Sequence, residues 1–203
     1  MKPEDIERAS MEIIERELAE RGVLISSEVL PVVMRVIHAT ADFDFAESLA
    51  FSPGAVTAGN AALARGESVV TDTWMAAAGV NKKRMARNGG EVRCYMADES
   101  VAQEAERRGV TRAAVSMERA AAETPGAVFA LGNAPTGLLR LCELTREGRA
   151  CPALIVGVPV GFVNVLESKE ALTQVTGVPW ILARGRKGGS SVAAAIVNAL
   201  LYL

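Results

Sequence analysis

Roughly the last two thirds of the chain alternate between short apolar runs rich in β-branched residues and longer stretches with helical periodicity. Five runs are typical of strands, and a helical stretch follows each of them. The strands are expected at 68–71, 92–96, 128–131, 154–158 and 180–183, and the helices at 73–87, 99–122, 135–147, 166–175 and 190–202. Strands that alternate with helices favour a parallel sheet covered on both faces. We therefore predict an α/β fold with a flavodoxin-like, doubly wound, parallel five-stranded sheet.

The beginning of the chain follows a helical rhythm instead. Apolar residues recur at near i, i+3/i+4 spacing within residues 3–21, with charged residues between them, so an amphipathic helix is expected there. Further helices are expected at 27–40 and 53–65. We interpret the 203 residues as one domain, in which residues 1–65 are N-terminal helices and residues 66–203 are the α/β core.

Composition narrows the classes of partner. The net charge is -2, from 22 basic and 24 acidic residues, and no block of like charge marks a surface for nucleic acid or a membrane. The first residues lack the apolar region of a signal peptide. The longest uncharged runs, such as 150–166, are shorter than the ~20 apolar residues of a membrane span. We expect a cytoplasmic protein that binds neither nucleic acid nor a membrane.

The cysteines and the histidine bear on metal binding. Cys94, Cys142 and Cys151 are odd in number, unevenly spaced and form no C-x-x-C motif, which argues against a disulfide framework and against a zinc site. A single histidine in the chain also argues against a His-based metal cluster. We therefore expect no bound metal.

Four loops follow the predicted strands at the edge where doubly wound sheets bind ligands, at 71–73, 132–136, 157–161 and 184–190. Three of them are rich in Gly or Pro, which allow a ligand close to the backbone, and each leads into a helix N-terminus, which favours anions. The candidate contact residues in or next to these loops are Thr71, Asp72, Asn133, Ala134, Pro135, Thr136, Val160, Gly161, Phe162, Arg184, Gly185 and Arg186.

Some of these positions also have a structural interpretation. On the residues alone a helix cap is the favoured interpretation of Asn133, and Pro135 is typical of a first helical position. The segment GRKGGSS at 185–191 resembles a phosphate loop, but its glycine spacing matches no known fingerprint. It either binds an anion through backbone N–H groups and nearby basic side chains, or it forms a tight turn with solvated charges.

His38 is the only histidine in the chain and lies in the sequence RVIHATADFDF. Arg35 lies three residues earlier and Asp42 four residues later, so the three side chains share roughly one face of a helix. An imidazole usually has a pKa near ~6.5, so it exchanges protons at neutral pH. Two interpretations remain open: an acid–base catalyst, or an ordinary histidine held by Asp42.

Five other positions are weaker candidates on the residues alone. Ser168 and Lys169 lie at the start of a predicted helix, where solvated polar residues are common. Thr111 and Arg112 lie at a polar break between two helices, and such an arginine is usually a surface residue. Ser10 lies in the middle of the first helix, where most serines have no specific role.

Eight stretches from near the N-terminus to the last helix carry a combined signature: ERASMEII, RVIHATADFDF, FSPGAV, GVTRA, LGNAPTGLLRL, GVPVGFV, ESKEAL and VPW.LARGRKGGS. Any one of them alone is a weak signal. Together they resemble the precorrin-8X methylmutase family, which includes the cobalt-precorrin-8 methylmutases. The resemblance covers nearly the whole chain, and the combination of RVIHATAD, GNAPT, PVGFV…ESK and GR.GGS is highly specific.

The resemblance implies a homodimer that acts on a tetrapyrrole without a cofactor. The implied reaction moves a methyl group from C-11 to C-12 of precorrin-8X or cobalt-precorrin-8 and yields hydrogenobyrinate or cobyrinate. The resemblance places the catalytic histidine at His38 and substrate-contacting residues at Ser10, Arg35 and Arg112. Because the family's active site lies at the dimer interface, Arg112 is a candidate for the pocket of the partner.

The chain departs from the family pattern at two places. Many members have small residues where this chain has Asn164, Val165 and Leu166, and bulkier side chains there are expected to reshape the pocket wall. Many members also have a serine where this chain has Ala113. Two other classes of function stay open: a tetrapyrrole carrier without activity, and a flavodoxin-like nucleotide-binding module that uses GRKGGSS.

Overall fold

The computed structural model describes residues 3–203. In this range the chain forms α1 (Pro3–Glu20), α2 (Leu30–Thr40), α3 (Phe45–Ser48), β1 (Leu49–Phe51), α4 (Ala55–Ala64), β2 (Val69–Thr71), α5 (Trp74–Gly79), α6 (Lys82–Arg87), β3 (Val92–Arg93), α7 (Glu99–Arg108), α8 (Arg112–Glu123), β4 (Val128–Leu131), α9 (Pro135–Arg146), β5 (Leu154–Gly157), α10 (Val165–Thr173), β6 (Trp180–Ala183) and α11 (Ser190–Tyr202). No helix in residues 3–203 is both long and apolar enough to cross a membrane.

The strands form one six-stranded sheet in the order β1-β6-β5-β4-β2-β3. All neighbouring pairs are parallel except β1 and β6, which run antiparallel. The prediction of a purely parallel five-stranded sheet is therefore wrong in strand number and in direction at one edge. The five predicted strands do form, although β3 is shorter than expected.

The missed strand lies in the segment 1–65, for which we predict helices alone. β1 is only three residues long, with Leu49 opposite Ala183 and Phe51 opposite Ile181. Its strand conformation comes from pairing with the edge of β6, whose paired residues lie 130 to 134 positions further along the chain, so no local pattern predicts it. An antiparallel edge strand on an otherwise parallel sheet is a common arrangement.

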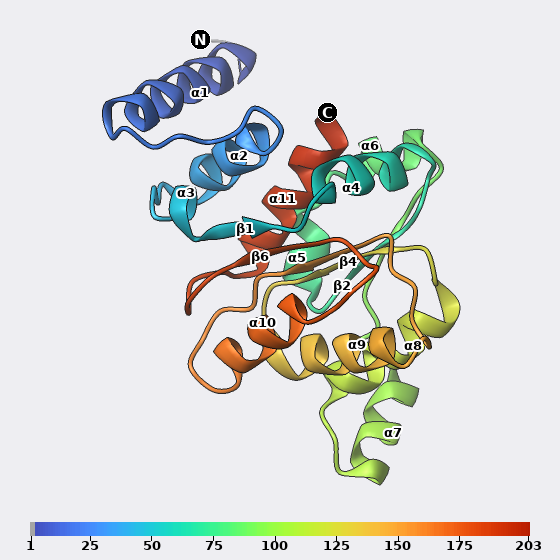
Figure 1. Ribbon diagram of the computed structural model, residues 1–203. Helices are drawn as coiled ribbons and strands as arrows, with labels where there is room; N and C mark the ends of the chain where they lie inside the picture. The colour runs from blue at the N-terminus through green and yellow to red at the C-terminus, as the bar shows by residue number, and fades with distance from the viewer. Residues whose placement is uncertain (1–2) are drawn as a thin grey trace.

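Helices cover both faces of the sheet, as Figure 1 shows. Alternate strand residues point to opposite sides: Val128 and Ala130 pack with α11 and α4, whereas Phe129 and Leu131 pack with α8, α9 and α10. On the first side α2 packs against α11, and α1 packs against α2. The predicted α/β class, with N-terminal helices outside the sheet, is confirmed.

Two long predicted helical stretches are each divided in two. The stretch 73–87 breaks because Val80 is extended and the side chain of Asn81 then caps α6 by accepting the N–H of Arg84. The stretch 99–122 breaks at Gly109, which has a left-handed backbone (φ 65°), and at the cap Thr111. The second break agrees with the polar break predicted at Thr111-Arg112.

A buried carboxylate joins the loops after two neighbouring strands. Asp72, which directly follows β2, is completely buried. Its Oδ1 accepts the N–H of Gly132 at 3.0 Å, and its Oδ2 accepts those of Asn133 and Ala134 at 2.7 and 2.6 Å. Burial raises the pKa of Asp72, while these backbone N–H groups act in the opposite direction because they stabilise the ionised form.

A buried ammonium fixes the loop after β6. The Nζ of Lys169, on α10, donates to the carbonyl oxygens of Gly185 and Lys187, both at 2.8 Å. The side chain is almost fully buried. In the same loop, the carbonyl oxygen of Arg186 accepts the N–H of Gly161, and the N–H of Gly189 donates to the carbonyl oxygen of Val158. Segments 158–161 and 184–189 are therefore held together at the carboxyl edge of the sheet.

The buried lysine should make the free energy of unfolding depend on pH. Burial lowers the pKa of Lys169 from 10.5 to about 8. Between about pH 8 and 10.5 the unfolded chain keeps this proton while the folded chain has lost it, so the cost of burying the charge is relieved and stability rises with pH. Lys169→Met lacks this titration and also loses both hydrogen bonds.

Urea unfolding of the wild type and of Lys169→Met at pH 7.5, 8.5 and 9.5 checks this expectation. The free energy of unfolding of the wild type should increase relative to that of the variant across this series, because all other titrations cancel in the difference. A constant difference would mean that the two carbonyl oxygens keep the lysine pKa at its ordinary value.

Candidate active site

His38 is exposed and lines a hollow between α1 and α2. The hollow has a volume of about 240 Å³, and Ser10, Ile13 and Glu17 of α1 face Ile37 and His38 of α2 across it. The side chain is therefore neither sealed in the core nor remote from a cavity. The structure brings Ser10 and His38 together although 28 residues separate them.

Arg35 lies one turn earlier on α2 but lines a neighbouring hollow of about 300 Å³ beside Met11 and Met34. Its Nη1 pairs with Glu7 Oε1 of α1 at 2.6 Å, and its guanidinium lies 5.9 Å from the centre of the Tyr202 ring. Ser10, Arg35 and His38 thus all belong to the α1–α2 pair, with the arginine held beside the histidine's hollow rather than in it.

Asp42 does not hold His38 in this structure. Its Oδ2 accepts a hydrogen bond from Lys187 Nζ at 2.6 Å, and Lys187 also pairs with Asp44 at 2.5 Å. The hydrogen bond from Lys187 is the main reason that the pKa of Asp42 is lowered. This ion pair joins the end of α2 to the loop after β6, so the histidine's helix is tied to the carboxyl edge of the sheet.

Several predicted contact residues face inwards and bind the protein itself. Thr71 is buried and donates to Thr73 O at 3.0 Å, and Ser168 is buried and donates to Val165 O at 2.8 Å. Asp72 and Lys169 make the internal contacts described above, and Ala134 is buried. In this arrangement these residues hold the loops in place, so their side chains offer little surface to a ligand.

Other predicted residues are open to a ligand. Asn133, Val160, Phe162, Arg184 and Arg186 are exposed, and the Arg186 guanidinium lies 5.3 Å from the centre of the Phe162 ring. Gly185 is exposed with them, while Gly161, Pro135 and Thr136 are half-buried. The carboxyl edge therefore combines exposed guanidinium groups with exposed apolar side chains, which suits a flat, acid-bearing ligand.

The departures at 164–166 separate into different roles. Asn164 has a left-handed backbone (φ 58°) and precedes α10, and Val165 is buried in the protein core. Leu166 lines a cavity of about 350 Å³ beside Lys169 and Arg184. The prediction of a reshaped pocket wall stays a prediction, and Leu166 is the residue of the three that is placed to act directly on a cavity.

The same cavity contains residues that the sequence analysis missed. Trp180 and Leu182 of β6, Ala50 of β1 and Thr173 of α10 line it. Val163, which is 78% exposed beside Phe162, was missed as well. The high exposure of an apolar side chain is a structural signal, and the sequence around Val163 looks like any buried run.

Thr111 and Arg112 lie at the start of α8. Thr111 accepts the N–H of Ala114 and donates to Thr136 Oγ1 at 2.9 Å, which places this turn beside the 132–136 loop. Arg112 is exposed. Ala113 is buried and packs near Gly137, so this departure from the family lies in the contact between α8 and α9.

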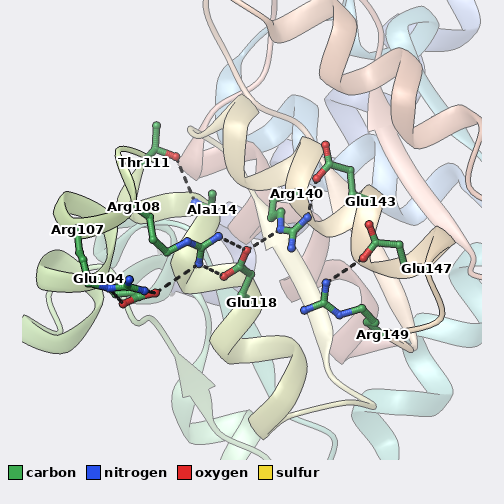
Figure 2. A network of polar contacts seen from close by, with 10 residues as sticks. All are labelled: Glu104, Arg107, Arg108, Thr111, Ala114, Glu118, Arg140, Glu143, Glu147 and Arg149. Carbon is green, nitrogen blue, oxygen red and sulfur yellow. Dashed lines mark hydrogen bonds and ion pairs between the residues drawn. The ribbon is translucent and has the colours of Figure 1, made fainter.

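A network of ion pairs supports that turn, as Figure 2 shows. Glu118 of α8 accepts hydrogen bonds from Arg108 of α7 and from Arg140 of α9, which lies 2.7 Å away. The hydrogen bond from Arg108, followed by the contact with Arg140, lowers the pKa of Glu118. Three helices are therefore fixed around one carboxylate that sequence reasoning did not single out.

Arg112 and His38 lie on opposite sides of the sheet. α8 covers one face, whereas α2 packs on α11, which covers the other face (Figure 1). A single copy of the chain therefore does not bring Arg112 into the hollow of His38.

Comparison with known proteins agrees along the whole chain. The family model described as precorrin-8X methylmutase matches residues 5–203. The chain is 45% identical over 203 residues to the cobalt-precorrin-8 methylmutase of Priestia megaterium, covering 100% of this chain and 89% of that protein. It is 44% identical over 196 residues to the precorrin-8X methylmutase of Pseudomonas aeruginosa, covering 96% and 93%.

The fold also matches a solved structure. The crystal structure of precorrin-8X methylmutase from Thermus thermophilus superposes with a TM-score of 0.90 and 42% identity, covering 98% of this chain and 95% of that one. Full-length identity and a shared fold together confirm the family resemblance carried by the eight sequence stretches. The chain therefore belongs to the precorrin-8X methylmutase family and is a methylmutase, an isomerase of cobalamin biosynthesis.

Proposed function

We propose that the hollow shared by His38 and Ser10 is the place where this methylmutase gives a proton to its substrate, precorrin-8X or cobalt-precorrin-8. The observation that carries the proposal is the exposure of the chain's single imidazole at a cavity tied to the carboxyl edge of the sheet. An exposed imidazole in such a cavity can approach a bound ligand, and imidazole is the side chain most often used as a general acid.

The proposed reaction is a rearrangement within one molecule. The bond from the methyl group to C-11 breaks and a bond to C-12 forms, so no group enters or leaves apart from protons. Protonation by His38 makes the conjugated ring system more electron-poor, which lowers the barrier to migration of the methyl group. General acid catalysis of this kind typically contributes about 10²–10⁴-fold to a rate.

The other proposed roles are in binding. A tetrapyrrole of this class is flat and carries many carboxylates, so it needs cations at its edge and apolar contact on its face. Arg35, Arg184 and Arg186 supply guanidinium groups, and guanidinium binds carboxylates well because its donors match their geometry. Phe162 and Val160 supply exposed apolar surface, and Ser10 supplies a hydroxyl beside His38.

We further propose that two copies of the chain build each site. The hollow at His38, about 240 Å³, is smaller than the roughly 300–1,000 Å³ typical of ligand pockets. Arg112 lies across the sheet from it, and Val160, Phe162 and Val163 remain exposed. A homodimer in which the partner's Arg112 reaches the hollow of His38 accounts for all three observations.

The nucleotide-binding alternative has little support. The order β3-β2-β4-β5-β6 is the 2-1-3-4-5 order of flavodoxin-like sheets, in which a ligand sits between the first and third strands. Here that position, between β2 and β4, is filled by the Asp72 carboxylate. In the GRKGGSS loop the N–H of Gly189 already donates to Val158. An inactive tetrapyrrole carrier would bind the substrate without converting it, so a turnover assay distinguishes it from an enzyme.

The acid role of His38 is tested with His38→Ala. We expect turnover to fall by about 10²–10⁴-fold while tetrapyrrole binding survives, because the side chain is exposed and supports no core contact. The spectral change from substrate to product measures turnover, and fluorescence quenching measures binding. Added imidazole should restore part of the rate, whereas pyrazole, which is almost unprotonated at neutral pH, should not. Normal turnover in the variant would refute the role.

The shared site is tested with a hybrid dimer. His38→Ala and Arg112→Ala chains, each of which we expect to lose most of its activity as a homodimer, are co-expressed with different tags and the hybrid is isolated by two affinity steps. One of its two sites then has both native residues, so about half of the wild-type activity is expected. A dimer of two differently tagged His38→Ala chains is the control and should stay inactive. An inactive hybrid would show that Arg112 does not act across the interface.

A further inference from the structure

Asp72 is a completely buried carboxylate that contacts the loop leading into α9, yet the proposed reaction gives it no role. We propose that Asp72 is a positioning residue of the methylmutase reaction: an internal anion that fills the crevice between β2 and β4 and fixes the 132–136 loop for substrate binding. This inference rests on the proposed function only in taking that loop to contact the substrate.

The geometry favours an ionised carboxylate at this position. Both oxygens accept backbone N–H groups: Oδ1 accepts Gly132, and Oδ2 accepts Asn133 and Ala134. These three donors stabilise the ionised form, against the burial that raises the pKa of this carboxyl. The N-terminus of the twelve-residue helix α9 follows directly, and the helix dipole also favours a negative charge there.

The fold creates the crevice and the side chain closes it. After β2 the chain enters α5, which packs against α11, whereas after β4 it enters α9, which packs against α8 and α10. The two loops diverge between strands that are direct neighbours, which is where doubly wound sheets hold the anionic part of a ligand. In this chain the carboxylate of Asp72 takes the position of that anion.

The space around the carboxylate is closed by the backbone. A Cβ on Gly132 would lie 2.5 Å from Gly189 O, so the loop after β4 lies directly against the start of α11. Next to Asp72, Thr73 Oγ1 and Ser190 Oγ lie 2.8 Å apart within hydrogen-bonding distance. The carboxylate is therefore enclosed by three segments and has no surface for a substrate.

The loop that Asp72 fixes carries open polar groups. The N–H of Asn133 is bound to the carboxylate while the residue itself is exposed, so the direction of its side chain depends on this hydrogen bond. Thr136, one turn further, contacts Thr111 beside Arg112. Loss of the internal anion should loosen these groups together, which weakens substrate binding because binding groups act only when they are held in the right geometry.

The experiment restores the anion from solution. Asp72→Gly leaves the three N–H groups without a partner and leaves space for a small carboxylate, so formate at roughly 0.1–0.5 M should occupy it. We expect KM to rise by about tenfold while kcat changes less than about threefold. Formate should bring KM and the melting temperature back towards wild-type values, and chloride at equal ionic strength should not.

Two variants serve as controls. Asp72→Asn fills the same space with an amide, so formate should not rescue it. Leu63→Ala removes a buried side chain near the end of α4, at the opposite edge of the sheet, so it should lower the melting temperature without changing KM or responding to formate. Hydrogen exchange of the Gly132, Asn133 and Ala134 amides should speed up in Asp72→Gly and slow again with formate.

Two results would overturn the inference. A lower melting temperature in Asp72→Gly with an unchanged KM would show a structural role alone. Failure of formate to slow amide exchange or to restore KM would show that the three N–H groups do not hold an anion. The exchange and melting measurements need no turnover, so they remain decisive even if His38 proves not to be the acid.

Discussion

Burying the Asp72 carboxylate is the constraint on which the arrangement of the site depends. Removing a charge from water costs several kcal/mol in a real protein. Hydrogen bonds to a charged group each return about 1.5–3 kcal/mol, and this carboxylate accepts three of them from backbone N–H groups. Those N–H groups would otherwise be left at a buried helix start without a partner. The carboxylate and the loop therefore stabilise each other, and neither is favourable alone.

Lys169 is a buried charge of the opposite sign that is stabilised in the same way. Its ammonium binds two carbonyl oxygens of the loop after β6, as the Asp72 carboxylate binds N–H groups of the loop after β4. Internal ions thus fix the backbone of the loops after β4 and after β6. The exposed side chains of Arg184 and Arg186 therefore extend from a loop whose backbone is held in place. In the same loop, Lys187 pairs with Asp42, which lies just after the helix that carries His38.

The sequence predicted what local pattern determines and missed what distant pairing determines. The runs around Val128 and Ile155 were found because a strand buried on both faces is apolar at every position. β1 was missed because Leu49 to Phe51 become a strand only through β6. Asp72 lies at the predicted edge of the sheet, but its position after a strand did not distinguish a side chain that faces a ligand from one that faces the protein. For Lys169 the sequence favoured a solvated helix start, and the side chain is buried instead, because its two carbonyl partners come from a loop 16 and 18 residues further along the chain.

The site combines fixed loops at the carboxyl edge of the sheet with the outer helices α1 and α2, and this arrangement suits the proposed chemistry. A rearrangement within one molecule needs no second substrate and no nucleophile, so one acid is enough and the remaining demand is to hold a broad ring in one orientation. Rigid loops meet that demand, because flexible loops would have to become ordered when the substrate binds and the lost entropy would weaken binding. His38 lies outside the sheet layers on α2, next to surface that a single chain leaves open. In the proposed dimer the acid therefore meets its substrate where two rigid edges face each other, and neither edge has to move to build the site.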